Sequence, residues 1–430
     1  MEENVKENEF VTIAKKLWEK IKKFVRSGIK QIFVGFGEAI KDEWGNLRET
    51  FSEKKLREGF RIFLKNFTHN FDIVYLCVVI ALVVYGLIVL SSAGDTGTVL
   101  NQIIFVAGGI LAMLIISNLK VETIKKISPF LMFIATILLF LVFTRADYNG
   151  THRRFFGMQP SELGKVTLIM WLAYLMDRHK KSKDKPSAFL TFLIITAAYG
   201  VLIAAESHLS GCLLYLCIGY AMMWYADMNK KCFAGVTAFV IVVFLVAVWK
   251  PEIIPGVKDY QLERIVIWKK ILFNGELTSN EKLNKARQVL QSLYGIGSGG
   301  LLGVGYGNSG QKISNLQEKD NDFIFAVLGE ELGFIGAILM LAAYAALVYL
   351  GFKIAFKTKT TYGRLVALGI STQMALQVLI NVAVATSLLP NTGISLPFFS
   401  NGGSSMVVNL ASMGIMLSIS KDSGQVKKDA

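Results

Sequence analysis

Long apolar stretches separated by short polar connectors run through most of this 430-residue chain. Ten of these stretches reach or approach the roughly 20 residues that a helix needs to span a bilayer. The pattern therefore predicts an all-α polytopic membrane protein with about ten transmembrane helices. Their approximate limits are 72–93, 102–117, 129–144, 163–176, 189–205, 211–226, 233–249, 323–352, 365–389 and 406–420.

Lysine and arginine are concentrated in alternate connectors. By the positive-inside rule these connectors and both termini are expected in the cytoplasm. The long connector at 250–322 is then a large extracytoplasmic loop between spans 7 and 8, and 421–430 is a cytoplasmic tail. The basic residues are Lys120, Lys125 and Lys126; Arg178, Lys180, Lys181, Lys183 and Lys185; Lys230 and Lys231; Lys353, Lys357, Lys359 and Arg364; and Lys421, Lys427 and Lys428.

Residues 1–71 form a separate arm before the ten-span membrane domain at 72–430. Apolar residues recur there at helical spacing from Phe10 to Ile32, and lysines and arginines fill the positions between them. The pattern predicts a basic amphipathic helix that lies on the inner leaflet or docks a cytoplasmic partner. No cleavable signal peptide is expected, because the first long apolar run starts far from Met1 and is too long.

Composition narrows the class of protein. Hydrophobic residues make up 53% of the chain and charged residues 18%, which is more apolar surface than one soluble core would hide. The formal net charge of +14 falls mostly in the connectors and the arm, where an anionic membrane surface would hold it. Nucleic-acid binding is therefore excluded. The four cysteines lack paired or metal-like spacing and are interpreted as buried small hydrophobes.

A proline- and glycine-rich segment at 388–405, LLPNTGISLPFFSNGGSS, lies between the last two apolar runs. Such a segment cannot be a helix. Irregular backbone near bilayer depth is tolerated only where protein covers it or where it lines a water-filled cavity. The segment therefore predicts a re-entrant loop beside a cavity, with an ordinary interhelical turn as the alternative.

Charged residues cluster at the start of the fourth span, in NGTHRRFFGMQPSELGK. Glu162 and Lys165 are three residues apart on one helical face, which favours a local ion pair. An ionisable residue so close to lipid is otherwise a candidate for function.

Further acidic residues lie in or beside later spans. Glu206 and His208 follow the fifth span, and Glu330 and Glu331 lie inside the eighth. Adjacent residues on a helix point about 100° apart, so at least one of Glu330 and Glu331 should face the bundle interior. Several charged groups are thus expected on one side of the membrane.

Six segments carry a resemblance to a known family. They are NGTHRRFFGMQPSELGK, ESHLSG, YQLERI, QSLYGIGSGGLLGVGYGNSGQK, NDFIFAVLGEELGFIGA and LPNTGISLPFFSNGGSS. In order and spacing they resemble those of the SEDS (shape, elongation, division and sporulation) family of FtsW/RodA-like peptidoglycan glycosyltransferases. The match spans about 72–420, and the glycine-rich string is closer to the FtsW branch.

The resemblance implies an enzyme of the bacterial cytoplasmic membrane. Members of this family have ten spans and polymerise lipid II at the outer membrane face, in cell division, elongation or sporulation. A class B penicillin-binding protein, a transpeptidase, is the usual partner within a divisome, elongation or spore-wall complex. Cationic side chains or a divalent cation, Mg²⁺ or Mn²⁺, can stabilise the diphosphate that leaves when a sugar hydroxyl attacks.

The family's catalytic carboxylate is an aspartate about ten residues before the QSL motif. In this chain no aspartate lies between Asp259 and Asp320, and counting back from Gln291 gives Glu281. The resemblance therefore makes Glu281 the candidate base, with Glu276 as second candidate. The alternative is that both residues are solvated loop glutamates without a catalytic role.

The family pattern also implies a set of substrate-binding residues. Among them, a position near the diphosphate is expected for Arg153, Lys165 and Lys312, and a cavity-lining position for Glu330 and Ser404. The full set is Arg153, Glu162, Lys165, Arg264, Gln291, Ser292, Lys312, Asp322, Glu330, Ser400 and Ser404.

Some positions depart from the family pattern, namely Ser207, His208, Gln317 and Asn401. Together with the missing aspartate they leave a second function open. That alternative is a catalytically weak or inactive relative that scaffolds a complex or translocates a lipid-linked precursor. The glycines at 295–310 do not fit a P-loop and are interpreted as flexible backbone under the sugar chain.

Overall fold

The computed structural model describes residues 72–144, 158–206, 209–249, 259–273, 275–278, 286–311, 316, 318–391 and 393–424. Its regular elements in this part of the chain are helices. They are α3 (Ile73–Ala93), α4 (Thr96–Ser117), α5 (Val121–Val142), α6 (Pro160–Arg178), a short 3₁₀ turn (Lys180–Ser182), α7 (Pro186–Ala205), α8 (Leu209–Tyr225), α9 (Lys230–Trp249), α10 (Asp259–Leu272), α11 (Arg287–Ser298), α13 (Ile324–Lys357), α14 (Thr361–Ala385) and α15 (Gly403–Gly424).

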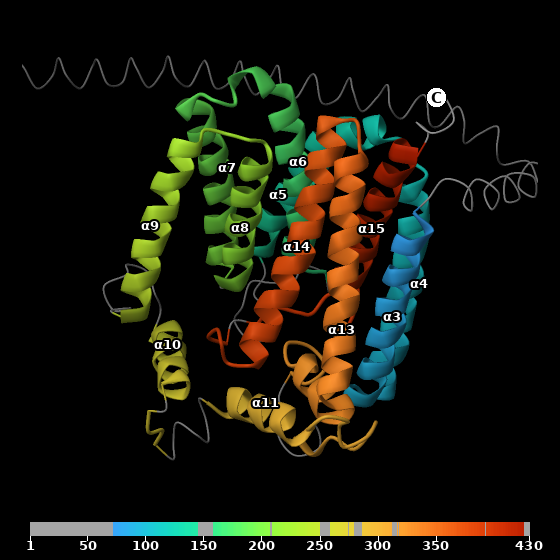
Figure 1. Cartoon of the computed structure of the whole chain (residues 1–430), viewed down its shortest axis with the longest axis vertical. Coiled ribbons are helices and arrows are strands. Elements are labelled where there is room, and N and C mark those ends of the chain that lie inside the picture. The colour runs from blue at the N-terminus through green and yellow to red at the C-terminus, as the bar shows by residue number, and fades with distance from the viewer. Residues whose placement is uncertain are drawn as a thin grey trace, which may run out of the picture.

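The long helices run side by side as one bundle (Figure 1). Seven of the described helices, α3, α4, α5, α7, α13, α14 and α15, are long and apolar enough to cross a membrane. Helices α6, α8 and α9 run alongside them (Figure 1). The all-α polytopic membrane fold predicted from the apolar pattern is thereby confirmed. The arm at 1–71 and the last residues of the tail lie outside the described residues, so the predicted division of the chain stays a prediction.

Helices α10 and α11, from the long connector 250–322, lie at one end of the bundle, called the loop end below (Figure 1). Helix α15 ends at the opposite end of the bundle (Figure 1). Because successive long helices alternate in direction, α6, α8 and α13 all begin at the loop end. Residues from three different stretches of sequence can therefore meet there.

Several helices are longer than their apolar cores. Helix α5 begins at Val121, eight residues before the predicted limit at 129, so Lys125 and Lys126 lie inside it and not in a connector. Lys125 contacts Asp177 of α6 at 2.5 Å, which lets a charged first turn pack against a neighbouring helix. Pro129 lies within α5, where it removes one backbone hydrogen bond without ending the helix.

The segment at 386–402 returns partway along the bundle before α15 starts (Figure 1). Its backbone is hydrogen-bonded by side chains from the surrounding spans. Gln102 of α4 donates to the Ser400 carbonyl and accepts from the Gly402 amide, both at 3.3 Å. Tyr344 of α13 donates to the Pro397 carbonyl. The expected re-entrant loop is present, and protein groups satisfy its polar atoms.

Helix α13 is broken at Gly333, whose φ is 63° and ψ is −163°. The glycine-rich loop after α11 fills the break. The amides of Val304 and Gly305 donate to the carbonyls of Glu330 and Glu331, each at 3.0 Å. On the other side of the break, the amides of Phe334 and Ile335 donate to Gly300 and Leu301. The loop expected to be flexible is thus a backbone splint for two half-helices.

A closely packed apolar layer joins α6, α8 and α14 on the side of the cavity away from the loop end. At Gly369 of α14, an added Cβ would lie 2.5 Å from Ile169 of α6 and 2.7 Å from Met222 of α8. Ile169, Met222, Leu168 and Val366 are all fully buried around this point. The three helices that frame the loop-end site therefore close against one another below it.

The splint predicts different costs for two glycines with the same φ of 83°. A Cβ at Gly303 would lie 2.1 Å from the Glu331 carbonyl oxygen, whereas a Cβ at Gly307 meets nothing within 4 Å. Gly307→Ala should cost about 1–2 kcal/mol from backbone strain alone. Gly303→Ala should lower the melting temperature of the detergent-solubilised protein clearly more. Gly108→Ala, in open space within α4, is the unstrained control. Equal shifts for Gly303→Ala and Gly307→Ala would contradict the splint.

Candidate functional site

A cavity of about 100 Å³ lies where the first turns of α6 and α8 meet α14, the residues before α13 and the re-entrant loop. It is the cavity expected beside the re-entrant loop. Its walls combine charged, amide and hydroxyl groups with backbone. The lining residues are Gln159, Ser161, Glu162, Lys165, Gly211, Leu214, Tyr215, Asn321, Asp322, Gln377, Gly393, Ile394 and Ser395.

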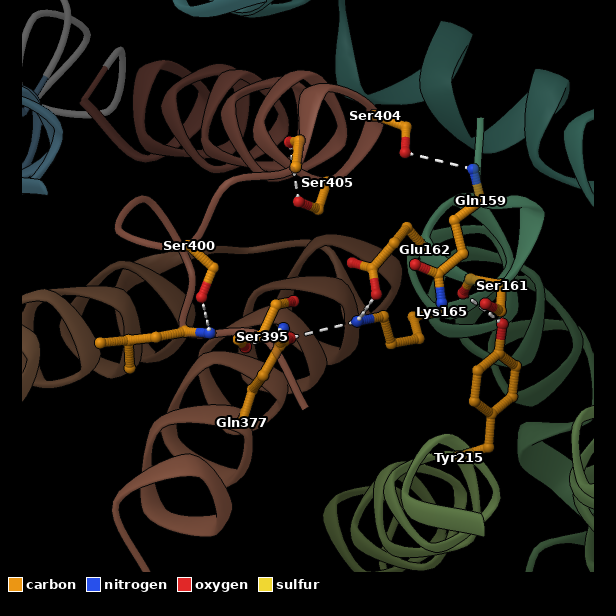
Figure 2. A network of polar contacts seen from close by, with 12 residues as sticks. Gln159, Ser161, Glu162, Lys165, Tyr215, Gln377, Ser395, Ser400, Ser404 and Ser405 are labelled. Atoms are coloured by element: carbon orange, nitrogen blue, oxygen red, sulfur yellow. Dashed lines mark hydrogen bonds and ion pairs between the residues drawn. The ribbon is translucent and has the colours of Figure 1, made fainter. Parts of the chain in front are cut away.

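A buried ion pair is the centre of this site. Lys165 Nζ lies 2.9 Å from Glu162 Oε1, and the two side chains are 4% and 6% exposed. The expected local ion pair is confirmed. Lys165 also donates to Gln377 Oε1 of α14 at 3.2 Å, so one ammonium joins two helices (Figure 2). Glu162 lies in the first turn of α6, where the helix dipole favours its negative charge.

Two amides of α14 connect the ion pair to the irregular segments. Gln377 donates to the Ser395 carbonyl at 3.0 Å. One turn further on, Asn381 donates to the carbonyls of Asp322 and Ile394, at 3.0 and 2.7 Å. Sequence reasoning missed both residues. Their signal was present, because two buried amides four residues apart in a membrane span form a polar stripe on one face.

Tyr215 of α8 forms another wall of the cavity, and sequence reasoning missed it as well. Its hydroxyl donates to the Ser161 carbonyl at 2.7 Å. A Cβ at Gly164 would lie 2.2 Å from that hydroxyl, so the glycine makes room for the ring. Nothing in the local sequence distinguishes Tyr215 from other apolar-span tyrosines.

Two polar atoms at the cavity have no hydrogen-bond partner in the part of the chain that the structure describes. They are Ser161 Oγ and Glu162 Oε2. Both residues line the cavity and are almost fully buried. A buried polar atom left unpaired costs about 1–3 kcal/mol. These two atoms are therefore the groups at which a polar ligand or water would gain most.

The serines of the re-entrant loop have structural partners. Ser400 Oγ donates to the Asn321 carbonyl and accepts from the Leu396 amide, both at 2.7 Å. Ser404 Oγ accepts from the Gln159 amide at 3.2 Å and so joins the start of α15 to the start of α6 (Figure 2). Neither serine is among the cavity-lining residues.

Four other predicted substrate-binding residues are described, and only one of them lines the cavity. Asp322 lines it. Arg264 of α10 is exposed and donates to the Asn391 carbonyl at 3.0 Å. Ser292 of α11 is fully buried and donates to the Ala385 carbonyl at 2.7 Å, while Gln291 is half-buried beside it. Of these four, the structure brings only Asp322 to the ion pair.

Glu330 and Glu331 are both buried, as expected for at least one of them. Their carboxylates hold other parts of the chain. Glu330 accepts from the Ser309 hydroxyl and from the amides of Gly310 and Gln311. Glu331 accepts from Ser92 of α3 at 2.6 Å. Glu330 is absent from the cavity lining and instead fixes the loop that precedes residue 312, so its substrate-binding role stays a prediction.

Three predicted site residues, Arg153, Glu281 and Lys312, lie outside the described residues, as does His208. Glu276 is described and is exposed on the segment 275–278. The catalytic assignments therefore stay predictions. Asn401, at a position where the family pattern was expected to be aromatic, donates to Asp320 at 2.9 Å and so fastens the re-entrant loop to the residues before α13.

The chain was compared with known families and proteins. A family model described as "Cell cycle protein", built on FtsW, RodA and SpoVE, matches residues 68–425. A probable peptidoglycan glycosyltransferase FtsW from Trichlorobacter lovleyi is 32% identical over 386 residues, which cover 85% of this chain and 95% of that protein. Stage V sporulation protein E from Bacillus subtilis is 33% identical over 334 residues, covering 75% and 86%.

A solved structure is also similar. Its subject is the structural coordination of polymerization and crosslinking by a peptidoglycan synthase complex. One chain of it superposes with a TM-score of 0.69 at 26% identity and covers 83% of this chain and 99% of its own length. The similarity thus extends over the bundle and the cavity described above.

The buried ion pair predicts a non-additive mutant pair. Lys165→Met should leave Glu162 as an uncompensated buried charge and cost roughly 3 kcal/mol. Adding Glu162→Gln removes that charge, so the double variant should be more stable than Lys165→Met alone. The measurement is the melting temperature of both single variants and the double variant in one detergent. Additive effects would show that the two side chains act independently.

Proposed function

This chain belongs to the FtsW/RodA/SpoVE family of cell cycle proteins, and on that premise we propose that it polymerises lipid II as a peptidoglycan glycosyltransferase. The observation that carries the proposal is the match over nearly the whole membrane bundle to a probable peptidoglycan glycosyltransferase. The SEDS resemblance expected from the six motifs is confirmed, with FtsW proteins among the most similar relatives. The chain is a multi-pass membrane protein.

The reaction joins two lipid-linked sugars. A hydroxyl of one lipid II attacks the anomeric carbon of the other glycan, whose bond to the lipid diphosphate breaks. A carboxylate takes the hydroxyl proton, and Glu281 is our first candidate with Glu276 as second. Arg153 and Lys312 are our candidates for the departing diphosphate, because fixed cations stabilise the charge that develops there.

In this proposal the reaction takes place at the loop end of the bundle. Three lysines lie at the opposite end of the described bundle. They are Lys125 in α5, Lys180 in the 3₁₀ turn and Lys421 in α15. The positive-inside rule supports a cytoplasmic location for that end, and so for both termini. The polar cavity would then face the outer half of a bacterial cytoplasmic membrane.

A divalent cation, Mg²⁺ or Mn²⁺, fits this reaction, but few side chains are available to bind it. In the described ranges no three His, Cys, Asp or Glu side chains come together as a metal site. Magnesium is often held by one or two carboxylates together with substrate phosphates. One or two carboxylates at the loop end, together with the diphosphate itself, would be enough to hold such an ion.

A class B penicillin-binding protein is the proposed partner, in division, elongation or sporulation. The support is the similar chain in a complex that couples polymerization to crosslinking. Lipid II polymerisation by the purified protein, with and without candidate transpeptidases, tests both the activity and the partner.

The catalytic assignment predicts the effect of two glutamine substitutions. Glu281→Gln should lower glycan synthesis at least about 100-fold, because general bases contribute 10²–10⁴-fold. Glu276→Gln should do so only if Glu276 is the base instead. The control is Asp227→Asn, an exposed carboxylate whose pKa is lowered by its hydrogen bond to Lys183 in a connector at the opposite end.

The readout is gel-resolved glycan from labelled lipid II. Full activity in the Glu281→Gln, Glu276→Gln and double variants would remove both candidates for the base. No glycan from the wild-type protein with any partner, together with rescue of a deletion strain by the double variant, would favour the scaffold or translocator alternative.

A further inference from the structure

We propose that the cavity at the start of α6 binds hydrogen-bond donors of the sugar, a hydroxyl or acetamido group, and does not bind the diphosphate. The inference rests on the proposed function and specifies one part of the substrate site. It also replaces the earlier expectation that Lys165 contacts the diphosphate. Three features of the cavity carry it: its charge, its unpaired acceptors and its size.

Among the residues that the structure describes, the charged groups that line the cavity carry a net negative charge. They are Glu162, Asp322 and Lys165, two carboxylates against one ammonium. Lys165 already donates to Glu162 Oε1 at 2.9 Å and to Gln377 Oε1 at 3.2 Å. A diphosphate would have to compete with a buried carboxylate for that ammonium and would lie beside like charges, which disfavours both anions.

The unpaired polar atoms of the cavity can accept a hydrogen bond from a ligand. Glu162 Oε2 is an acceptor with no hydrogen-bond partner among the described residues, and Ser161 Oγ, on the preceding residue, is likewise unpaired. Glu162 and Ser161 are 4% and 2% exposed. Lys165 occupies Oε1 of this carboxylate, so Oε2 is the oxygen left for a ligand. A ligand hydroxyl or amide N–H that reaches this corner therefore meets a charged acceptor with an open oxygen.

The size of the cavity limits what enters. A volume of about 100 Å³ compares with the roughly 10–15 Å³ that one water needs on the same measure. In the part of the chain that the structure describes, the cavity has room for several waters or for one polar substituent of a sugar. The bulk of the sugar would remain outside, with one substituent inserted between Ser161 and Glu162.

Turnover measurements test the contact. Ser161→Ala is the primary variant, because it removes one hydroxyl and leaves the ion pair intact. With the partner transpeptidase present, it should raise the KM for lipid II roughly five- to tenfold, the effect of one lost hydrogen bond, and change kcat less. Glu162→Gln, which removes the charge of the acceptor, should raise the KM further. Thr191→Ala, a hydroxyl of α7 bonded within its own helix, is the matched control.

A binding experiment separates the sugar from the diphosphate. The purified full-length protein is titrated with N,N′-diacetylchitobiose or with inorganic pyrophosphate, and the melting temperature is recorded. We expect chitobiose to raise the melting temperature of the wild type and of Thr191→Ala equally, and that of Ser161→Ala clearly less. Pyrophosphate should shift the melting temperatures of the wild type and of Lys165→Met equally, or should shift neither of them.

Three outcomes would overturn the inference. They are the absence of any chitobiose shift in the wild type, an unchanged KM in Ser161→Ala and Glu162→Gln, and a pyrophosphate shift that Lys165→Met abolishes. Each outcome counts only for a preparation in which the wild-type protein makes glycan. A wild-type protein that makes no glycan with any partner counts against the proposed function instead, so the two failures are distinguishable.

Discussion

Backbone that leaves a helix inside a membrane bundle must find its hydrogen bonds within the protein, because lipid offers none. The chain leaves the helical state at such depth in two described places, the break in α13 at Gly333 and the re-entrant loop before α15. The glycine-rich loop supplies the missing partners at the first place, and side-chain amides supply them at the second. The polar cavity lies beside the second place because the groups that satisfy the loop are themselves polar.

The same amides explain why the ion pair is so well held. Gln377 accepts from Lys165 through one end of its side chain and donates to the re-entrant loop through the other. The carboxylate of Glu162, the ammonium and the loop backbone are therefore one hydrogen-bonded unit. Displacing any member exposes the others as buried polar groups, so the geometry of the site is rigid before a substrate arrives.

The sequence predicted the elements whose signal is local. The apolar runs gave the all-α membrane fold, and spacing gave the Glu162–Lys165 pair. The site around the pair could not be predicted, because Tyr215 and Asn381 act on carbonyls more than ten residues away in the chain. The partners of Glu330 at 309–311 could not be predicted for a related reason, since they lie in a loop whose position depends on the break in α13. Helix ends were underestimated where charged first turns, such as that of α5, extend beyond the apolar core.

The apolar layer beneath the cavity has a consequence for the cell's energy supply. A polar chamber sunk into the bilayer shortens the path that a proton or ion must cross, and the full membrane voltage then falls over a thinner dielectric. Ile169, Met222 and Val366 close that path where three helices touch. The close contact of these few side chains therefore contributes electrical insulation as well as packing energy.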